Sequence, residues 1–247
     1  MLNTKADNNI RKAAWIICAV FTLGTLIMLL VNREYGDLPI CLTTFALICI
    51  PAIAEKLFSC RINFAVYLFG LLYALCPMLG DCYKLYYTTA WWDKLLHTFG
   101  GVIFALFGLY LYKILGGNTA RIIGGAVFAL CFSMALAVAW EFYEFGCDQL
   151  FGTDMQRDTV VSTIHSYMLG DALGEAGSIE NIKEVTVNGQ ALPVKGYMDL
   201  GLIDSMADMF FETLGAVAVA IISVLDKGRH PAFLSKAEYQ KALPQTA

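Results

Sequence analysis

Three parts of the sequence carry ionisable side chains at spacings that an α-helix brings onto one face. Asp93 and His97 are four residues apart, so a helix places both on the same side of one turn. Two acidic stripes have spacings of three or four residues: Glu141, Glu144 and Asp148, and then Asp204, Asp208 and Glu212. Such groups can bind a cation, exchange protons with a substrate or bind a polar headgroup.

The residue types favour a hard divalent cation. Carboxylates with a single imidazole suit Mg²⁺, Mn²⁺ or Ca²⁺ better than a thiolate-rich zinc site does. A ferritin-like di-iron site would need two Glu-x-x-His motifs, and the sequence has none. We predict His97, oriented by Asp93, as a catalytic general base or ligand beside the cation. The predicted cation ligands are Glu141, Glu144, Asp204, Asp208 and Glu212.

Some of these acids have a simpler alternative role. Asp93 would also stabilise the N-terminus of a helix through the helix dipole, and Asp148 would also suit a solvated loop. Glu141 and Asp208 are flanked on both sides by apolar residues, where an acid is costly, so a functional role is favoured for them. The nearest basic residues, Lys94 and Arg157, are too few to neutralise the acids.

The elements that must position these residues are membrane-spanning helices. Of 247 residues, 58% are hydrophobic and only 15% are charged, which is unusual for a soluble domain. The apolar residues form runs close to the roughly 20 residues that a spanning helix needs. We therefore predict an all-α polytopic membrane protein, a single integral membrane domain over residues 1–247, with six transmembrane helices. The predicted spans are 13–31, 38–54, 62–80, 93–115, 120–145 and 200–225.

The basic residues predict the orientation. With both termini inside the cell, eleven lysines and arginines are cytoplasmic and six are external, so the positive-inside rule favours N-in/C-in. The three ionisable stripes then fall at the outer ends of spans four, five and six. His97 is the one histidine expected at membrane depth, because His165 falls in an outer segment and His230 in the cytoplasmic tail.

A polar stretch at residues 148–198 is predicted to be an extracytoplasmic insertion between spans five and six. Its alternating residues around Asn188-Gly189 are the strongest short signal for a β-hairpin. A link rich in tyrosine and tryptophan at residues 81–93 suits the membrane interface.

The cysteines and the net charge add two constraints. Eight cysteines occur without a C-x-x-C motif, most of them inside apolar runs. Cys76, Cys82 and Cys147 would lie near the outer face, and a disulfide among them is left open. A net charge of −4 with no long basic run argues against nucleic acid as a partner.

Four segments resemble the bacterial inner-membrane family typified by YjdF, a family of unknown function. They are WDKLLH at 92–97, WEFYEF at 140–145, DQLFGTDMQ at 148–156 and GLIDSMAD at 201–208. The resemblance covers spans four to six, and it implies a multi-pass protein of the bacterial cytoplasmic (inner) membrane. Polar residues in and beside these segments are predicted to bind the ligand: Lys94, Asp148, Gln149, Gln156 and Arg157.

The sequence is more distantly similar to VanZ-like proteins, whose pattern is Asp-Lys-x-x-His, a later Glu and Gln, and a final Asp-x-x-x-Asn-x-x-Gly. Glu212 stands where that pattern has Asn, which adds a carboxylate. VanZ-like proteins are associated with low-level teicoplanin resistance, so this resemblance implies a role in the cell envelope or in antibiotic tolerance. The matching residues are Asp93, Lys94, His97, Glu141, Asp208 and Gly215.

Three classes of function stay open. One is an enzyme acting on a membrane lipid or lipid-linked envelope precursor, in which a divalent cation polarises a phosphoryl or acyl oxygen or activates a water. The second is a non-catalytic protein that binds a cation or a lipid headgroup. The third is an ion-coupled transporter, which the apolar inner halves of the spans disfavour. The sequence does not predict an oligomeric state.

Overall fold

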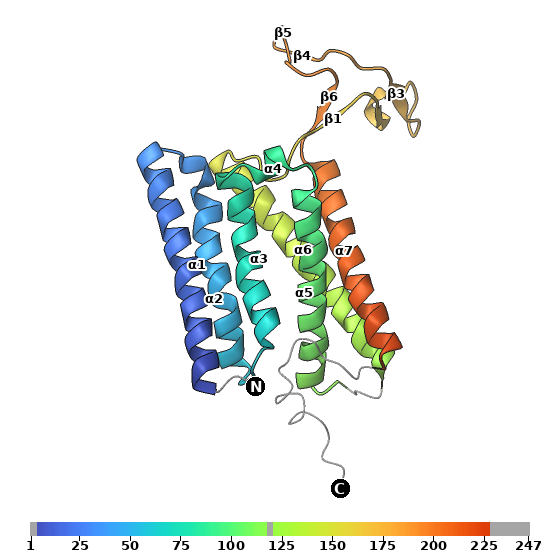
Figure 1. Ribbon diagram of the computed structural model, residues 1–247. Helices are drawn as coiled ribbons and strands as arrows, with labels where there is room; N and C mark the ends of the chain where they lie inside the picture. The colour runs from blue at the N-terminus through green and yellow to red at the C-terminus, as the bar shows by residue number, and fades with distance from the viewer. Residues whose placement is uncertain (1–3, 118–120, 228–247) are drawn as a thin grey trace. The chain divides into compact units, whose positions relative to one another are not determined.

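Six long helices dominate the fold. The computed structural model describes residues 4–117 and 121–227. The six are long and apolar enough to cross a membrane, which confirms an all-α polytopic membrane protein. The predicted start of span five at residue 120 and the placement of His230 lie outside the described residues. The helices are α1 (Thr4–Asn32), α2 (Leu38–Leu57), α3 (Phe64–Cys82), α5 (Trp92–Ile114), α6 (Ile122–Phe151) and α7 (Leu202–Leu225) (Figure 1).

The chain divides into two compact units. The first, the helical unit, comprises Met1–Trp140 and Asp208–Ala247. The second, the insertion unit, comprises Glu141–Ala207. Helices α6 and α7 therefore contribute to both units. The single membrane domain predicted from the sequence stays a prediction, as does the N-in/C-in orientation.

Local sequence signals set the ends of the early spans. Pro39 lies in the first turn of α2, where its missing N–H leaves no helical hydrogen bond unmade. Asn63 caps α3, because its side chain accepts a hydrogen bond from the Ala65 amide at 2.9 Å. Helix α2 begins at the predicted residue 38, and α3 begins two residues after the predicted residue 62, within the usual uncertainty of helix ends.

A network of ion pairs connects α1 with α2 and with the residues just before α3. The buried Arg11 guanidinium lies 3.0 Å from Asp7 Oδ2 and 3.0 Å from Glu55 Oε1. It also donates to the Ile62 carbonyl at 3.0 Å. Arg61 pairs with the same two carboxylates. We call Asp7, Arg11, Glu55 and Arg61 the α1–α3 cluster.

The aromatic link between α3 and α5 contains a short helix, α4 (Leu85–Thr88). Lys84 precedes it in the left-handed conformation, with φ of 61°. Its ammonium lies 3.1 Å from Asp37 Oδ2 at the end of the short 3-10 helix η1 (Tyr35–Asp37). The link is thereby tied to the connection between α1 and α2.

Small residues allow α5 and α7 to approach closely in the helical unit. A Cβ on Gly101 would collide with the backbone carbonyl of Glu212, and a Cβ on Gly215 would collide with that of Thr98. Only glycine fits at these two positions without moving a helix. Next to this contact, Ala105, Ala129, Ala216 and Val219 form a buried apolar cluster between α5, α6 and α7.

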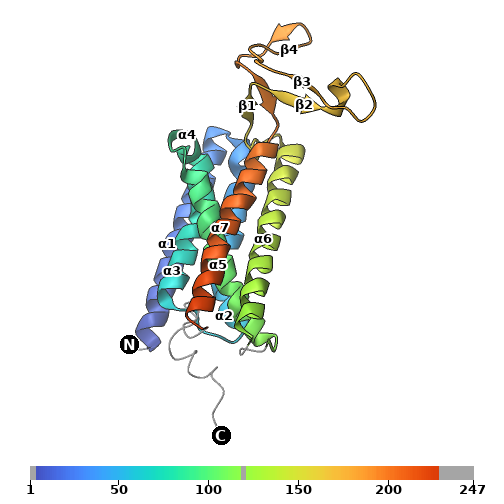
Figure 2. The same ribbon diagram turned by 90° about the vertical axis from the view of Figure 1, so that its right-hand side faces the viewer.

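The insertion unit contains three short antiparallel ladders. Strand β1 (Thr159–Val161) pairs with β6 (Tyr197–Asp199), and β2 (Ile164–Ser166) pairs with β3 (Gly177–Ile179) (Figure 2). A second short 3-10 helix, η2 (Tyr167–Leu169), follows β2. The sequence predicted only one hairpin here, because strands of three residues are too short to show a clear alternation.

The predicted hairpin is the third ladder. Strand β4 (Thr186–Val187) pairs with β5 (Gln190–Ala191). The turn residues Asn188 and Gly189 have φ of 53° and 80°. Positive φ at both turn positions is the type I′ geometry that Asn-Gly favours, so the hairpin is confirmed.

The insertion outside the helices covers residues 152–201, whereas the sequence placed its ends at 148 and 198. Asp148 still belongs to α6, and its carboxylate organises the chain that follows. It accepts hydrogen bonds from the Met155 amide at 2.7 Å and the Gln156 amide at 2.9 Å. All eight cysteines are free thiols, including Cys76, Cys82 and Cys147.

Candidate functional site

The helical unit holds a group of ionisable side chains that we call the α5–α7 cluster. Helix α5 supplies Asp93, Lys94 and His97 from its first two turns, and α7 supplies Asp208 and Glu212. The side chain of Asp208 is only 1% exposed, whereas that of Lys94 is 25% exposed. The cluster therefore has buried carboxylates and a partly exposed ammonium.

Lys94 links the two helices electrostatically. Its ammonium lies 2.9 Å from Asp93 Oδ2 and 2.6 Å from Asp208 Oδ1. Hydrogen bonds between charged groups of this length are the strong ones. The sequence placed Lys94 near the site, and the structure makes it the cation that bridges one carboxylate on each helix.

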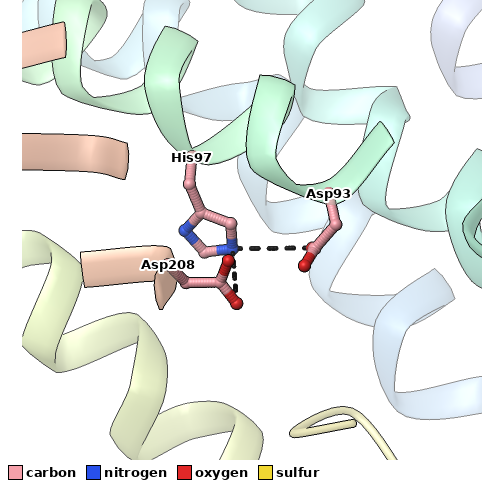
Figure 3. A group of neighbouring side chains, drawn as sticks. All are labelled: Asp93, His97 and Asp208. Atoms are coloured by element: carbon pink, nitrogen blue, oxygen red, sulfur yellow. Dashed lines mark ion pairs between the residues drawn. The ribbon is translucent and has the colours of Figure 1, made fainter. Parts of the chain in front are cut away.

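The His97 imidazole lies among three carboxylates. Nε2 is 3.7 Å from Asp93 Oδ1 and 3.6 Å from Asp208 Oδ2, and Figure 3 shows both carboxylates turned toward this nitrogen. Nδ1 faces Glu212, with 3.9 Å to Oε2. Both ring nitrogens of His97 therefore have carboxylate oxygens within 4 Å.

Ser133 on α6 is a member of the site that the sequence reasoning missed. Its hydroxyl is fully buried and lies 3.4 Å from Glu212 Oε1 and 3.3 Å from the Gly101 carbonyl. A serine inside an apolar run gives no signal of such a contact, because serines in spanning helices usually bond to their own backbone. Through this contact with Glu212, Ser133 adds a residue of a third helix, α6, to the cluster.

The glycine contact between α5 and α7 sets the geometry of the cluster. Glu212 itself provides the backbone carbonyl that lies against Gly101. His97 lies one turn before Gly101, and Asp208 one turn before Glu212. Close backbone approach therefore brings the imidazole on α5 and the carboxylates on α7 within reach of one another.

Three side chains of this cluster could hold a cation. Asp93, His97 and Asp208 each offer one ligand atom, and these atoms lie within 4.8 Å of one another (Figure 3). The sequence predicted Asp93 and His97 as a catalytic pair, with His97 as base or ligand, and it predicted Asp208 and Glu212 among the cation ligands. The structure brings all four into one cluster, and the cation itself stays a prediction.

The remaining predicted cation ligands belong to the insertion unit. Glu141 and Glu144 are buried on α6, each 6% exposed. Asp204 on α7 accepts a hydrogen bond from the Arg157 amide at 3.3 Å. Their role as cation ligands stays a prediction.

The other predicted binding residues also lie in the insertion unit, and most have structural contacts there. Gln156 donates to the Ser205 hydroxyl at 2.7 Å. Asp148 holds the loop after α6 as described above, and Gln149 is exposed. Partial burial and the charges of Asp158 and Asp148 raise the pKa of the Asp154 carboxyl, so acidic groups are crowded in this loop.

The fold and the site together define a multi-pass membrane protein with a buried acid–base cluster inside its helices. The model of the predicted membrane protein family DUF2238 matches residues 13–228, and the chain belongs to this family. This is the family typified by YjdF, so the first resemblance is confirmed, whereas the similarity to VanZ-like proteins stays a prediction. No curated protein and no solved structure matches the chain.

Proposed function

We propose that this protein is a membrane-embedded enzyme that acts on a lipid or lipid-linked envelope substrate, with His97 as its general base. The observation that carries the proposal is the buried imidazole among the carboxylates of Asp93, Asp208 and Glu212. Ionisable groups inside spanning helices are costly and are usually retained for function. A histidine flanked by carboxylates is a common way to hold a base in place.

The proposed reaction is hydrolysis or transfer at a phosphoryl or acyl group. His97 Nε2 takes a proton from water or from a substrate hydroxyl as that oxygen attacks. The Lys94 ammonium stabilises the negative charge that develops on the attacked group. The imidazolium then returns its proton to the leaving oxygen. A lipid substrate fits because Asp93, Lys94 and His97 lie in the first two turns of a membrane-spanning helix, the end of the helix that is close to lipid headgroups.

A second candidate is a non-catalytic protein that binds a cation or a lipid headgroup. The ligand atoms of Asp93, His97 and Asp208 within 4.8 Å of one another favour it. Two carboxylate oxygens and an imidazole nitrogen suit Mg²⁺, Mn²⁺ or Ca²⁺. Such a cation would compete with the Lys94 ammonium, because both would bind the carboxylates of Asp93 and Asp208.

The two candidates differ in one experiment. Purified protein is reconstituted into liposomes made from a bacterial polar lipid extract, and lipid species are followed by mass spectrometry with and without Mg²⁺ or Mn²⁺. For an enzyme, we expect time-dependent conversion of one lipid class by wild type. His97→Asn and Asp208→Asn should lose at least 100-fold of this rate, since a general base contributes about 10²–10⁴-fold.

Lys84→Met is the matched control, because Lys84 also pairs with an aspartate but lies outside the cluster. It should convert lipid at the wild-type rate. Identical lipid profiles for wild type and His97→Asn, with both proteins folded, would contradict catalysis. A Mn²⁺-dependent rise in melting temperature that Asp208→Asn abolishes would then favour the binding protein.

A further inference from the structure

The loop between β2 and β3 exposes a compact set of large apolar side chains. Met168 is 94% exposed and Leu173 is fully exposed, with Tyr167 at 73% and Leu169 at 38%. Single exposed hydrophobic residues are normal on a protein surface, but four within seven residues form a patch. We call these four side chains the apolar tip.

The loop holds the apolar tip in place. Ser166 accepts a hydrogen bond from the Met168 amide at 3.0 Å, and the β2–β3 ladder closes the base of the loop. Inside the loop, a Cβ on Gly170 would collide with the Glu175 carbonyl, and one on Gly177 with the Leu169 carbonyl. The exposed side chains are therefore presented by an ordered backbone, which lowers the entropic cost of binding.

Both ends of the insertion run into membrane-spanning helices. Helix α6 ends at Phe151 and α7 begins at Leu202, so the segment between them starts and ends on one side of the membrane. The chain from Phe151 to Tyr167, sixteen residue steps, reaches at most about 55 Å when fully extended. The apolar tip is thus tethered near a bilayer surface, where even weak insertion is favoured by high effective concentration.

The size of the apolar tip favours lipid over a protein partner. A stable protein interface uses about 20–30 residues and about 800 Å² on each side, whereas the tip offers four side chains. Tyrosine beside leucine and methionine is suited to the boundary between headgroups and acyl chains.

The charge of the loop indicates which lipid headgroups it can approach. Residues 166–177 contain Asp171 and Glu175 and no lysine or arginine. Anionic headgroups would repel these acids, whereas zwitterionic headgroups would not. We propose that the apolar tip inserts into the headgroup–acyl boundary of the membrane on its own side and prefers zwitterionic lipid. This inference does not depend on the proposed enzymatic function.

A fluorescent amino acid at position 173 tests the proposal. An environment-sensitive fluorophore is introduced by codon suppression, which leaves the eight cysteines unchanged, and the full-length protein is reconstituted in phosphatidylcholine nanodiscs. The control fluorophore replaces Val187 of the β4–β5 hairpin, which is 51% exposed. We expect blue-shifted emission at 173, and lipids with brominated acyl chains should quench it at least twofold more than at 187.

Two further measurements complete the test. Exchanging a third of the lipid for phosphatidylglycerol should reduce the quenching at 173, as should Met168→Ser in the same protein. Equal, weak quenching at both positions would place the tip in water and overturn the proposal. A blue shift that brominated lipid leaves unquenched, and that depends on the number of chains per nanodisc, would assign the tip to a second copy instead.

Discussion

The α1–α3 cluster and the α5–α7 cluster place charges inside the same helical unit in different ways. In the first, two arginines face two carboxylates, and Arg11 also donates to a backbone carbonyl and lies 4.6 Å from the centre of the Tyr67 ring. In the second, three carboxylates face one lysine and one histidine, and the imidazole contacts are 3.6–3.9 Å long.

The difference indicates that the α1–α3 cluster stabilises the fold, whereas the α5–α7 cluster is suited to binding or reaction. Guanidinium groups stay charged and bind carboxylates through a rigid fork, so the α1–α3 cluster is balanced and fixed. An imidazole can gain or lose a proton, and a lysine ammonium can be replaced by another cation. The α5–α7 cluster has an excess of carboxylates and groups that can exchange, which is what a site for a ligand or a reaction needs.

The largest expected effect is on Arg11. Arg11→Ala leaves Asp7 and Glu55 with half of their cationic partners and should reduce the free energy of unfolding by about 3–5 kcal/mol. Chemical unfolding in detergent measures it. Lys12→Ala, at an exposed neighbouring position, should stay within about 0.5 kcal/mol of wild type. Loss of lipid turnover in the folded fraction of Arg11→Ala would contradict a purely structural role.

Lys94→Met tests whether a metal ion can replace the ammonium in the α5–α7 cluster. In this variant, we expect the melting temperature to depend on Mn²⁺. It leaves Asp208 buried without its ammonium partner, and we expect a loss of about 2 kcal/mol. Mn²⁺ should then restore the melting temperature by occupying the vacated position. Lys94→Met/Asp208→Asn should show no such recovery. Equal Mn²⁺ responses in wild type and Lys94→Met would argue that the ion and the lysine do not compete.

Gly215→Ala tests whether the approach of α5 and α7 positions the second cluster. The added methyl group collides with the Thr98 carbonyl, so the helices must separate at a cost of about 1–3 kcal/mol. Lipid conversion should fall together with stability. The control is Gly24→Ala in α1, where a Cβ meets no atom within 4 Å. That change should be neutral or stabilise the helix by up to about 1 kcal/mol.

The smallest expected effect concerns Lys84. Partial burial acts to lower the pKa of its ammonium, but the hydrogen bond and the charge of Asp37 outweigh burial and leave this pKa above the ordinary value of 10.5. The pair therefore stabilises the fold below that pH, and its contribution is lost as pH rises beyond it. Lys84→Met should cost less than about 0.5 kcal/mol at pH 8, since the lysine is half exposed. The melting temperatures should converge above pH 10.5.

The sequence predicted most of the helices and part of the α5–α7 cluster for a clear physical reason. Long apolar runs require spanning helices, and a spacing of four fixes which side of a helix two residues share. Asp93 with His97, and Asp208 with Glu212, follow from these two rules. The alternation of spans between the two faces of the membrane then brings both pairs to the same depth.

The contacts that depend on helix rotation could not be predicted in this way. Ser133 joins the cluster because α6 turns that residue toward Glu212, and spacing within one helix does not show which neighbour it faces. Arg11 and Arg61 counted only as basic residues that indicate orientation, although they bind Asp7 and Glu55 from different segments. Glu141, Glu144 and Asp204 matched the pattern equally well but belong to the insertion unit.

The type I′ turn at Asn188-Gly189 is also a suitable site for inserting a tag. Both residues are exposed, and they are held by a ladder of only two residue pairs, so the turn can accept a short epitope or protease site with little disturbance to the helices. An antibody is then added to intact cells. If it binds a tag at this turn but not a tag at the N-terminus, the turn is outside the cell and the N-terminus is inside, which determines the membrane topology of the chain.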